Sequence, residues 1–506
     1  MRSLFFISVL DTIFARGRQR SLELTKHFVG LVISSRYLSG EKRASFRFLY
    51  REMTSGFLLF LSLVFSIRTR KKRSTRTERA LSFRVKKMRL FSFFLYREMT
   101  RASITILILL ICSHSFAAKL KPGTYRAVLV LDTINEIELP FNFDVIKKGK
   151  KLQIIIKNAS EKIVVDEITI KGDSVNFKMP VFDTEFRTKL VNGNLQGVWI
   201  NHYRKEKNII PFKAEFDNPN RFSFAPGKMN PYFEGRWETT FSPGKPDSSK
   251  AIGIFNHLEQ TDYIHGTFLT ETGDYRFLEG MKVTNKLYLS CFDGSHAFLF
   301  IAIHKDNKFT GTFYSGAHWK EEWIAVKNEE FKLRDAEEIT TIKDPNTQPN
   351  FTFPNLDGNK VSLSDKKFEN KPVIIQIMGS WCPNCMDESN YLGGIFKQYQ
   401  KQGLEIIALA FEKTDDLTIA TKNVNRLKKK FDLQYEILLT QLTGKDKAGE
   451  TFPALSKITA FPTTIFLNKE HKIVKIHTGF SGPATGNDYL VYKIRTENLI
   501  NQLIKQ

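Results

Sequence analysis

The chain has 506 residues, which is too long for one ordinary hydrophobic core, so two or three domains are expected. Its formal net charge of +23 would suggest a nucleic-acid or membrane partner, but the charge is unevenly distributed. Residues 1–100 hold 22 Lys+Arg against 6 Asp+Glu, whereas the remaining 406 residues hold 54 against 47. Because no basic motif with a nucleic-acid-reading fold occurs after residue 100, we predict no nucleic-acid partner.

Residues 1–98 form a basic leader without the composition of a folded domain. They contain no Pro and no Trp, and residues 68–73 are a basic run. The segment Phe48–Thr54 recurs unchanged as Phe94–Thr100. We predict that translation starts at Met88 or Met99 and that the upstream part is a misassigned start. The alternative is a genuine basic, membrane-proximal extension.

Residues 99–117 have the pattern of a secretory signal peptide. A positive start is followed by the apolar block Ile104–Ile111 and by small residues at Ser115 and Ala117, which predicts cleavage before Ala118. Cys112 raises a lipoprotein alternative, but Ile111 stands where a lipobox has a small residue. The signal predicts a periplasmic or cell-envelope protein, with membrane anchoring left open.

Residues 118–336 have the pattern of an all-β region. Short runs rich in β-branched residues are broken by Gly, Asn and Asp, with no long helical period between them. The predicted strands are residues 128–131, 152–156, 163–165, 168–170, 263–265, 286–292 and 297–304. We expect antiparallel sheets, sandwich-like or barrel-like.

A weak internal echo recurs in this β region at a spacing of about 110 residues, which predicts two related modules over 118–220 and 231–330. The matching segments are Gly123–Tyr125 with Gly235–Trp237, Val181–Asp183 with Cys291–Asp293, and Gly197–Trp199 with Gly311–Phe313. The many aromatic residues are expected to pack in the cores of the modules. The alternative is an exposed aromatic patch that binds a partner.

The region has two further residue types that bear on chemistry. Cys291 lies in an apolar strand, so we expect a buried, inert thiol there. Five histidines are scattered among the strands at no ligand spacing, so we predict no metal site and no cofactor.

Residues 337–350 are a predicted linker, charged at first and then polar, and residues 351–506 alternate between β and α patterns. Asp357-Gly358 predicts a hairpin between residues 351–353 and 361–363. Further strands are expected at residues 406–411, 435–438, 464–467 and 473–476, and helices at 416–431 and 488–504. Together with the elements around the cysteine pair, this pattern predicts a mixed sheet covered on both faces.

A Cys-x-x-Cys motif lies where a predicted strand passes into a predicted helix. The apolar run Val373–Met378 ends at Gly379, and Cys382 and Cys385 follow directly. The unpaired N–H groups and positive dipole of a helix start favour a thiolate. Cys382 is therefore expected to be the exposed attacking sulfur, and Cys385 the thiol that resolves the mixed disulfide. A zinc site, which would need further ligands, and an inert local disulfide are the alternatives.

Residues from about 350 to 506 resemble a bacterial envelope thioredoxin of the TlpA/ResA type, a family of thiol–disulfide oxidoreductases. The matching segments are Phe353–Gly358, Val361–Asp365, Trp381–Cys385, Glu388 and Phe461–Thr463. The resemblance implies a multidomain chain in which an N-terminal all-β region is followed by an α/β thioredoxin-like domain. It does not cover the β region.

The resemblance also implies roles for five side chains. Pro462 would be cis and would lie beside the cysteine pair, whereas a trans proline that opens a strand is the alternative from the residues alone. Trp381, Pro383 and Phe461 would contact the partner, although Phe461 is bulkier than the expected small or β-branched residue. Glu388 would exchange a proton with the active thiols, and a solvated glutamate in the first helical turns is the alternative.

Two classes of function follow. The first is an enzyme that reduces disulfides of other envelope proteins, cycling between a dithiol and a Cys382–Cys385 disulfide. The resemblance implies re-reduction by a membrane electron donor of the DsbD/CcdA type. The second is a partner-binding protein whose β modules recognise a protein while the thioredoxin domain docks or senses redox state. A thiol peroxidase is a third option, which the cysteine pair disfavours.

Overall fold

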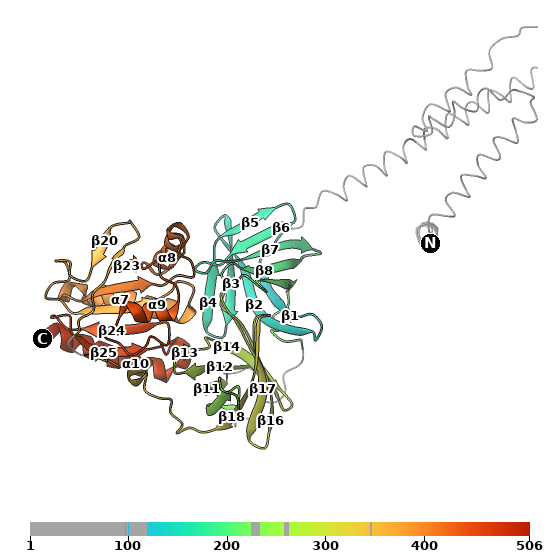
Figure 1. Cartoon of the computed structure of the whole chain (residues 1–506). Coiled ribbons are helices and arrows are strands. Elements are labelled where there is room, and N and C mark those ends of the chain that lie inside the picture. The colour runs from blue at the N-terminus through green and yellow to red at the C-terminus, as the bar shows by residue number, and fades with distance from the viewer. Residues whose placement is uncertain (1–96, 98–99, 101–118, 224–232, 258–262, 345–346) are drawn as a thin grey trace, which may run out of the picture. The chain divides into compact units, whose positions relative to one another are not determined.

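The computed structural model describes residues 97, 100, 119–223, 233–257, 263–344 and 347–506 (Figure 1). The predicted leader and signal peptide, Cys112 included, lie outside the described residues apart from Arg97 and Thr100. Residues 111–506 form one compact unit. In the part of the chain that is described, no helix combines the length and the apolar character needed to cross a membrane.

The first β module is a nine-stranded antiparallel sheet with the strand order β4-β3-β2-β1-β9-β8-β7-β6-β5. Its strands are β1 (Gly123–Asp132), β2 (Ile137–Lys148), β3 (Lys151–Asn158), β4 (Glu161–Val165), β5 (Ile168–Lys171), β6 (Ser174–Lys178), β7 (Thr184–Val191), β8 (Asn194–Asn201) and β9 (Ile209–Phe216). The first and last strands are neighbours, with Tyr125 opposite Phe216. Burial alternates along β7, as expected for a strand with one face on a core.

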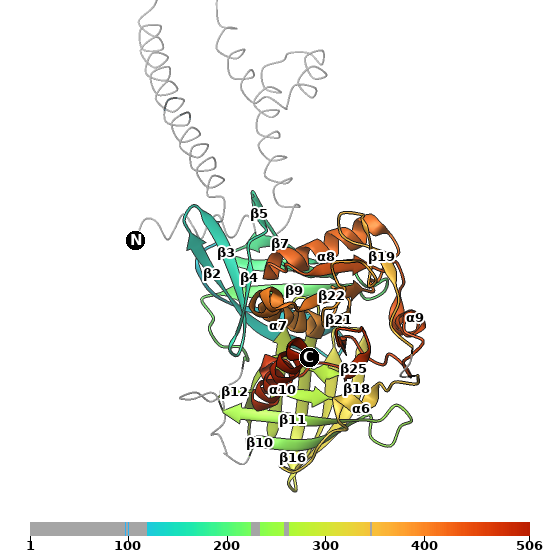
Figure 2. The ribbon, with the colours of Figure 1, turned by 90° about the vertical axis from the view of Figure 1, so that its left-hand side faces the viewer.

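The second β module is also antiparallel, with the order β11-β10-β18-β17-β16-β15-β14-β12-β13, and β11 pairs with β12 as well. This extra pairing closes the sheet on itself. Its strands are β10 (Gly235–Phe241), β11 (Ser249–His257), β12 (Tyr263–Thr270), β13 (Gly273–Asp274), β14 (Leu278–Val283), β15 (Lys286–Phe292), β16 (Ala297–Lys305), β17 (Lys308–Ser315) and β18 (Trp319–Lys327). Figure 2 shows this module in green and yellow.

The sequence echo has a structural basis, because the repeated segments occupy equivalent places in the two sheets. Gly123 opens β1 with φ 142° and Gly235 opens β10 with φ 103°, a region that L side chains rarely adopt, so both positions favour glycine. The aromatic residues two positions later, Tyr125 and Trp237, are both fully buried. The antiparallel fold class predicted for the β region is confirmed, and the region contains two nine-stranded sheets.

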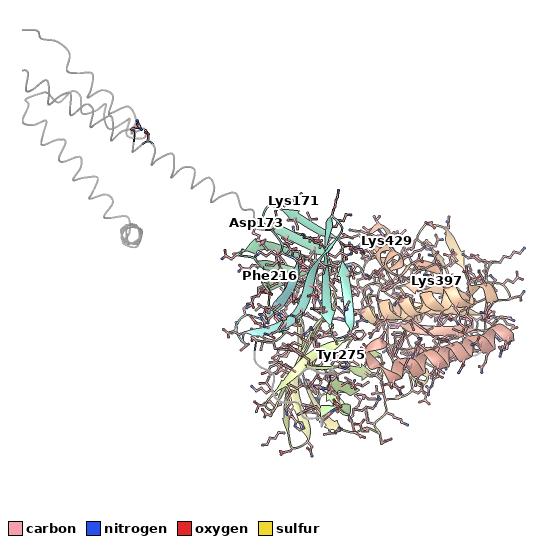
Figure 3. The ribbon with its side chains drawn as sticks, turned by 180° about the vertical axis from the view of Figure 1, so that it is seen from behind. Lys171, Asp173, Phe216, Tyr275, Lys397 and Lys429 are labelled. Atoms are coloured by element: carbon pink, nitrogen blue, oxygen red, sulfur yellow. The ribbon has the colours of Figure 1, made fainter. Side chains whose placement is uncertain are left out.

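The aromatic residues of the second module form its core rather than a surface patch. Trp237, Phe268 and Trp323 are fully buried, and the Phe268 and Phe300 rings stack with centroids 4.6 Å apart. Tyr275, labelled in Figure 3, packs edge-on against Phe300 at 5.5 Å. Among the described residues, Trp319 is the one aromatic side chain of the β modules with large exposure, 49%. The prediction of core packing is confirmed.

The C-terminal domain has a five-stranded mixed sheet with the order β23-β22-β21-β24-β25. Its strands are β21 (Val373–Met378), β22 (Glu405–Ala410), β23 (Glu436–Leu439), β24 (Thr463–Leu467) and β25 (Ile473–Thr478), and the hairpin β19 (Thr352–Pro354)–β20 (Lys360–Ser362) precedes them. β21, β22 and β23 are parallel, whereas β24 and β25 are antiparallel. The helices are α6 (Ala336–Ile339), α7 (Pro383–Tyr399), α8 (Leu417–Phe431), α9 (Gly444–Thr451) and α10 (Asn487–Lys505), with short 3-10 turns η3 (Gln400–Gln402) and η4 (Pro483–Thr485).

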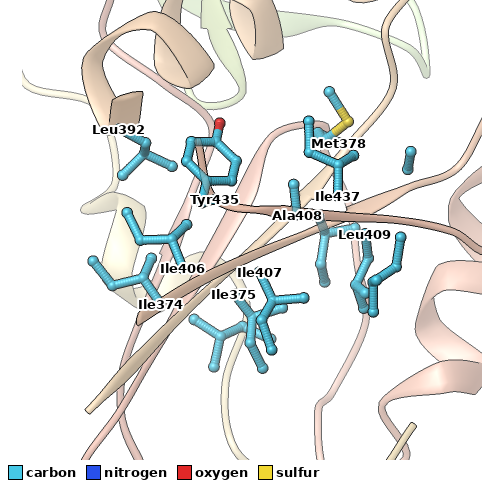
Figure 4. Packing of buried hydrophobic residues seen from close by; sticks show 14 of the residues in the cluster. Ile374, Ile375, Met378, Leu392, Ile406, Ile407, Ala408, Leu409, Tyr435 and Ile437 are labelled. Atoms are coloured by element: carbon cyan, nitrogen blue, oxygen red, sulfur yellow. The ribbon is translucent and has the colours of Figure 1, made fainter. Parts of the chain in front are cut away.

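Both faces of this sheet are covered, because every residue of β21 and β24 is buried. Figure 4 shows the packing of Ile374, Ile406 and Ile437, which lie on three adjacent strands. The charged residues Lys397 and Lys429, on α7 and α8, are labelled in Figure 3 and are exposed.

Two features of this domain differ from expectation. Helix α9 was not predicted, because its sequence Gly-Lys-Asp-Lys-Ala-Gly-Glu-Thr has a single buried residue, Ala448, and hence no apolar period. On α10, Leu490, Ile494, Leu499 and Leu503 recur at helical spacing, which predicts one buried stripe, but two of them are exposed. Leu490 and Ile494 are 53% and 62% exposed, while Tyr492 and Ile500 are buried instead.

One buried arginine joins the two β modules to the C-terminal domain. The Arg276 side chain is 1% exposed, and its Nη2 lies 2.5 Å from Glu161 Oε1 on β4. Its Nε lies 3.6 Å from Asp293 Oδ2, and its Nη1 contacts Asp387 on α7. Burial opposes the charge of Arg276, but Glu161 and Asp293 outweigh that effect and raise its pKa.

Replacement of this arginine is expected to destabilise the whole arrangement. In Arg276→Met the buried Asp293 and the partly buried Glu161 and Asp387 lose their shared cation, so the free energy of unfolding should fall by about 3–5 kcal/mol. Arg495→Met is the matched control, since the Arg495 side chain is 62% exposed and 3.8 Å from Asp335. The control should lose less than about 1 kcal/mol in urea denaturation. Equal stability of the two variants would contradict the role of Arg276.

Candidate functional site

The cysteine motif lies between β21 and α7, as predicted. Cys382 is the N-cap residue of α7, and its Sγ accepts a hydrogen bond from the backbone N–H of Cys385 at 3.4 Å. Pro383 occupies the first helical position, where its missing N–H removes no helix hydrogen bond. The local sequence therefore places the N-terminus of α7 next to the Cys382 sulfur.

The two thiols differ in acidity. A hydrogen bond from the Cys385 thiol, together with backbone N–H groups of the helix start, lowers the pKa of Cys382. Burial raises the pKa of Cys385 well above its ordinary value, because that sulfur is completely enclosed. The structure contains both as free thiols. Such a pair provides one sulfur suited to attack and one that ionises later.

The expectation that Cys382 is exposed is wrong. It is 9% exposed, because residues 380–385 are covered by neighbouring loops and its thiol reaches the Phe461 carbonyl at 3.5 Å. Cys382 instead lines a cavity of about 260 Å³. A substrate sulfur can therefore reach Cys382 only through this cavity or after the loops have moved.

The Phe461–Pro462 peptide bond is cis, as the resemblance implies. Pro462 directly precedes β24, which pairs with β21. The Phe461 ring lies 5.8 Å from the Trp381 ring. The structure thus brings Trp381, Pro383, Phe461 and Cys382 together around the same cavity.

Glu388 is completely buried on α7, so the alternative of a solvated glutamate is wrong. Its carboxylate accepts hydrogen bonds from Gln376 Nε2 at 2.8 Å, Thr464 Oγ1 at 2.7 Å and Tyr492 Oη at 3.3 Å. Burial outweighs these bonds and raises its pKa from 4.5 to about 7. Near neutral pH this carboxyl group can both hold and release a proton.

A second buried carboxylate next to the motif was missed by sequence reasoning. Glu412 Oε1 accepts from the backbone N–H of Ser380 and its Oε2 from the Ser380 hydroxyl, both at 2.7 Å. Glu412 lies two residues after β22, the strand parallel to β21, and the carboxyl ends of parallel strands meet at one edge of a sheet. This rule about parallel strands could have identified Glu412 as a neighbour of the motif from the sequence.

Both β modules contact the motif, which the sequence did not indicate. Ser295 Oγ, before β16, donates to the backbone carbonyl of Trp381 at 3.4 Å. Gly273 on β13 has φ 146°, a region that favours glycine, and a side chain there would meet the Asn384 side chain of the motif. In the first module, Asp183 Oδ1 pairs with Arg426 Nη1 on α8 at 3.0 Å.

Two other predicted features concern metal chemistry and the remaining thiol. Cys291 is fully buried, and burial raises its pKa well above the ordinary value, as expected for an inert thiol. Within the described residues there is no group of three or more His, Cys, Asp or Glu side chains that could hold a metal ion.

Comparisons with known proteins match the C-terminal part of the chain. Residues 346–476 match the model of the AhpC/TSA family. The thiol-disulfide oxidoreductase ResA of Bacillus thuringiensis is 33% identical over 127 residues, which are 25% of this chain and 65% of that protein. ResA of Bacillus subtilis is 28% identical over 150 residues, 30% of this chain and 75% of that protein.

Two solved structures match part of the chain at low similarity. A putative thiol:disulfide interchange protein DsbE from Chlorobium tepidum is 16% identical, with a TM-score of 0.25, over 32% of this chain and 99% of that one. The C-terminal domain of a putative thiol-disulfide oxidoreductase from Bacteroides thetaiotaomicron is 21% identical, with a TM-score of 0.24, over 31% and 94%. The C-terminal part of the chain is thus thioredoxin-like, with the family match over residues 346–476, and it is similar to ResA-type thiol–disulfide oxidoreductases.

Proposed function

We propose that this protein reduces disulfides of other cell-envelope proteins through a dithiol–disulfide cycle of Cys382 and Cys385. The proposal rests on the difference in pKa between the two thiols. The helix start and the Cys385 thiol lower the pKa of Cys382, whereas burial raises the pKa of Cys385. A low-pKa thiolate attacks a disulfide readily, and a buried partner thiol prevents a second external attack.

The cycle moves two electrons from the protein to its substrate. The Cys382 thiolate attacks one substrate sulfur, a mixed disulfide forms, and the other substrate sulfur leaves as a thiolate. The Cys385 thiol then loses its proton and attacks Cys382, which releases the second substrate sulfur. The Cys382–Cys385 disulfide remains, and the substrate has become a dithiol after it takes up two protons.

Glu388 is proposed to accept the proton that Cys385 must lose. It lies three residues after Cys385 on α7 and hence on the same helix face. Its pKa of about 7 suits a group that gains and loses a proton near neutral pH. Pro462 and Phe461, beside Cys382, are proposed to seat the chain of the partner.

The compartment and the electron supply belong to the same proposal. The predicted signal over residues 99–117 supports a location outside the cytoplasm, where the surroundings are oxidising. The cycle therefore needs a reductant, proposed to be a membrane thiol electron donor of the DsbD/CcdA type. The rival function, partner binding with the thioredoxin domain in a docking or sensing role, would leave the phenotype unchanged in Cys382→Ser.

The reduction potential of the cysteine pair tests the direction of electron flow. A reductase is expected to lie near the potential of thioredoxin, about −270 mV. Equilibration of the full chain with dithiothreitol mixtures, followed by thiol trapping, measures it. A value near that of a dedicated oxidant, about −120 mV, would overturn the proposed direction.

Single cysteine variants test the order of attack. Cys382→Ser is expected to abolish reduction of a model protein disulfide, whereas Cys385→Ser should accumulate a mixed disulfide because the resolving sulfur is gone. Non-reducing electrophoresis after incubation with the substrate separates these outcomes. Cys291→Ala is the control, since that buried thiol lies outside the cavity, and it should turn over normally. Trapping in Cys382→Ser rather than in Cys385→Ser would refute the assigned order.

Glu388→Gln tests the buried carboxyl group through pH. The folded-state pKa is raised above the unfolded value, so the folded chain holds its proton longer. The resulting stability is complete below about pH 4.5 and is lost as the pH rises to about 7. Between these pH values the wild type should lose roughly 3 kcal/mol relative to Glu388→Gln, because one pKa unit is about 1.4 kcal/mol.

The same pair of proteins also gives a kinetic readout. The rate at which Cys385 resolves a mixed disulfide should show a step near pH 7 in the wild type, and this step should be missing in Glu388→Gln. If the stabilities of the wild type and Glu388→Gln change with pH in the same way, and their rate profiles are identical, Glu388 does not titrate as proposed.

A further inference from the structure

The cavity beside Cys382 has walls from three parts of the chain. It has a volume of about 260 Å³. The thioredoxin-like domain contributes Cys382 and Phe461, the first β module contributes Arg204, and the second contributes His296. Any molecule that reacts with Cys382 in this closed arrangement therefore touches both β modules as well.

The ionisable side chains around this cavity, apart from Cys382, are basic or aromatic. Arg204 lies in the loop after β8, Lys413 follows β22, and Lys445 lies in α9. No Asp or Glu occurs among the described residues that line the cavity. The described part of the chain contains no ion pair that involves these three cations. Glu412 and Cys382 act on the charge of Lys413, and His296 is paired with Asp293 at 3.1 Å, so the protein balances the positive charge of the cavity only in part.

The pKa values of two basic side chains, Lys413 and His318, also reflect the positive charge in this region. Burial, followed by the charge of Arg204, lowers the pKa of Lys413. Burial and then Arg204 also lower the pKa of His318 to about 4. These cations repel one another, and an anion bound among them would relieve that repulsion.

Contacts with aromatic rings position Lys413, and neighbouring residues hold the loop that carries Arg204. Lys413 Nζ lies 4.4 Å from the centre of the Trp381 ring and 5.7 Å from that of Tyr203. The Tyr203 hydroxyl accepts a hydrogen bond from the Asp183 N–H at 3.0 Å, and Asp183 is itself paired with Arg426 on α8. The loop that carries Arg204 is therefore held against the cysteine motif.

We propose that this cavity selects disulfides whose reacting cysteine is flanked by carboxylates, with Arg204, Lys413 and Lys445 binding those carboxylates while Cys382 attacks. The inference rests on the proposed reductase function and names its substrate class. The electron balance is that of the cycle above: the S–S bond of the acidic substrate breaks, and the Cys382–Cys385 bond forms. An acidic protein segment and a small acidic disulfide share this chemistry.

A set of defined disulfides tests the selection. The reduced full chain is mixed in a stopped-flow instrument with symmetrical peptide disulfides whose cysteine is flanked by Glu, Gln or Lys, and with glutathione disulfide. The Glu-flanked peptide should react about 10-fold faster than the Lys-flanked peptide at low salt. The difference should shrink as the ionic strength rises from about 0.01 M to about 1 M, because the Debye length falls from about 30 Å to about 3 Å.

Charge variants connect the selection to the cavity. The double variant Arg204→Gln with Lys445→Gln should lower the Glu-to-Lys rate ratio severalfold, whereas Lys189→Gln, an exposed cation on β7 outside the cavity, should keep it. The ratio is the readout because a change in thiolate fraction would slow all peptides equally. If glutathione disulfide reacts as fast as the Glu-flanked peptide and its rate responds to the same variants, the substrates are small acidic disulfides. If glutathione disulfide reacts slowly, the substrate is a disulfide in an acidic protein segment.

The possible failures are distinguishable. Reaction with all peptides at equal rates, or a ratio that survives in the double variant, would overturn the charge selection and leave the reductase function in place. Absence of reaction with every disulfide, while Cys382 and Cys385 are shown to be reduced by thiol titration, would overturn the reductase function itself.

Discussion

A single buried guanidinium provides the main electrostatic link among the three parts of the described chain. Arg276 has four carboxylates around it, on β4, on β13, after β15 and on α7. Burial raises the pKa of Glu161 and of Asp274, whereas His296 lowers the pKa of Asp293. The carboxylates around this cation thus differ in acidity. Since Asp274 also accepts from the Gly482 N–H at 2.6 Å, the loop before α10 is held by the same cluster.

This link places the β modules where they affect the chemistry. Asp387, the partner of Arg276 on α7, lies two residues after Cys385 on the helix whose N-terminus faces Cys382. The modules therefore form part of the cavity wall as well as part of the scaffold. The acidity of the thiols, by contrast, depends on local groups: the Cys385 thiol and the helix start lower the pKa of Cys382, and burial followed by Cys382 raises that of Cys385. Reactivity and access to the site thus come from different parts of the chain.

Sequence reasoning was most successful where the controlling contacts are local. The strands of the C-terminal domain, the helix start at Cys382 and the two β modules follow from periodicity, glycine positions and the echo between Gly123 and Gly235. The burial of Glu388 could not be read in this way, because Tyr492 covers it from 104 positions away. The low exposure of Cys382 and the cationic lining also depend on long-range packing. No pattern within the loop that carries Arg204 reveals that it reaches the cysteine motif.

The second β sheet closes on itself and the first does not, and this difference affects the tendency of edge strands to associate with other chains. β11 pairs with β12 in the second module, whereas β4 and β5 end the first sheet without pairing to each other. Unpaired edge strands present backbone groups that can template association. Both edges are short, five and four residues, and bear lysines at Lys162 and Lys171. Such charged, truncated borders disfavour sheet-to-sheet aggregation, so an open sheet can be tolerated in a crowded compartment.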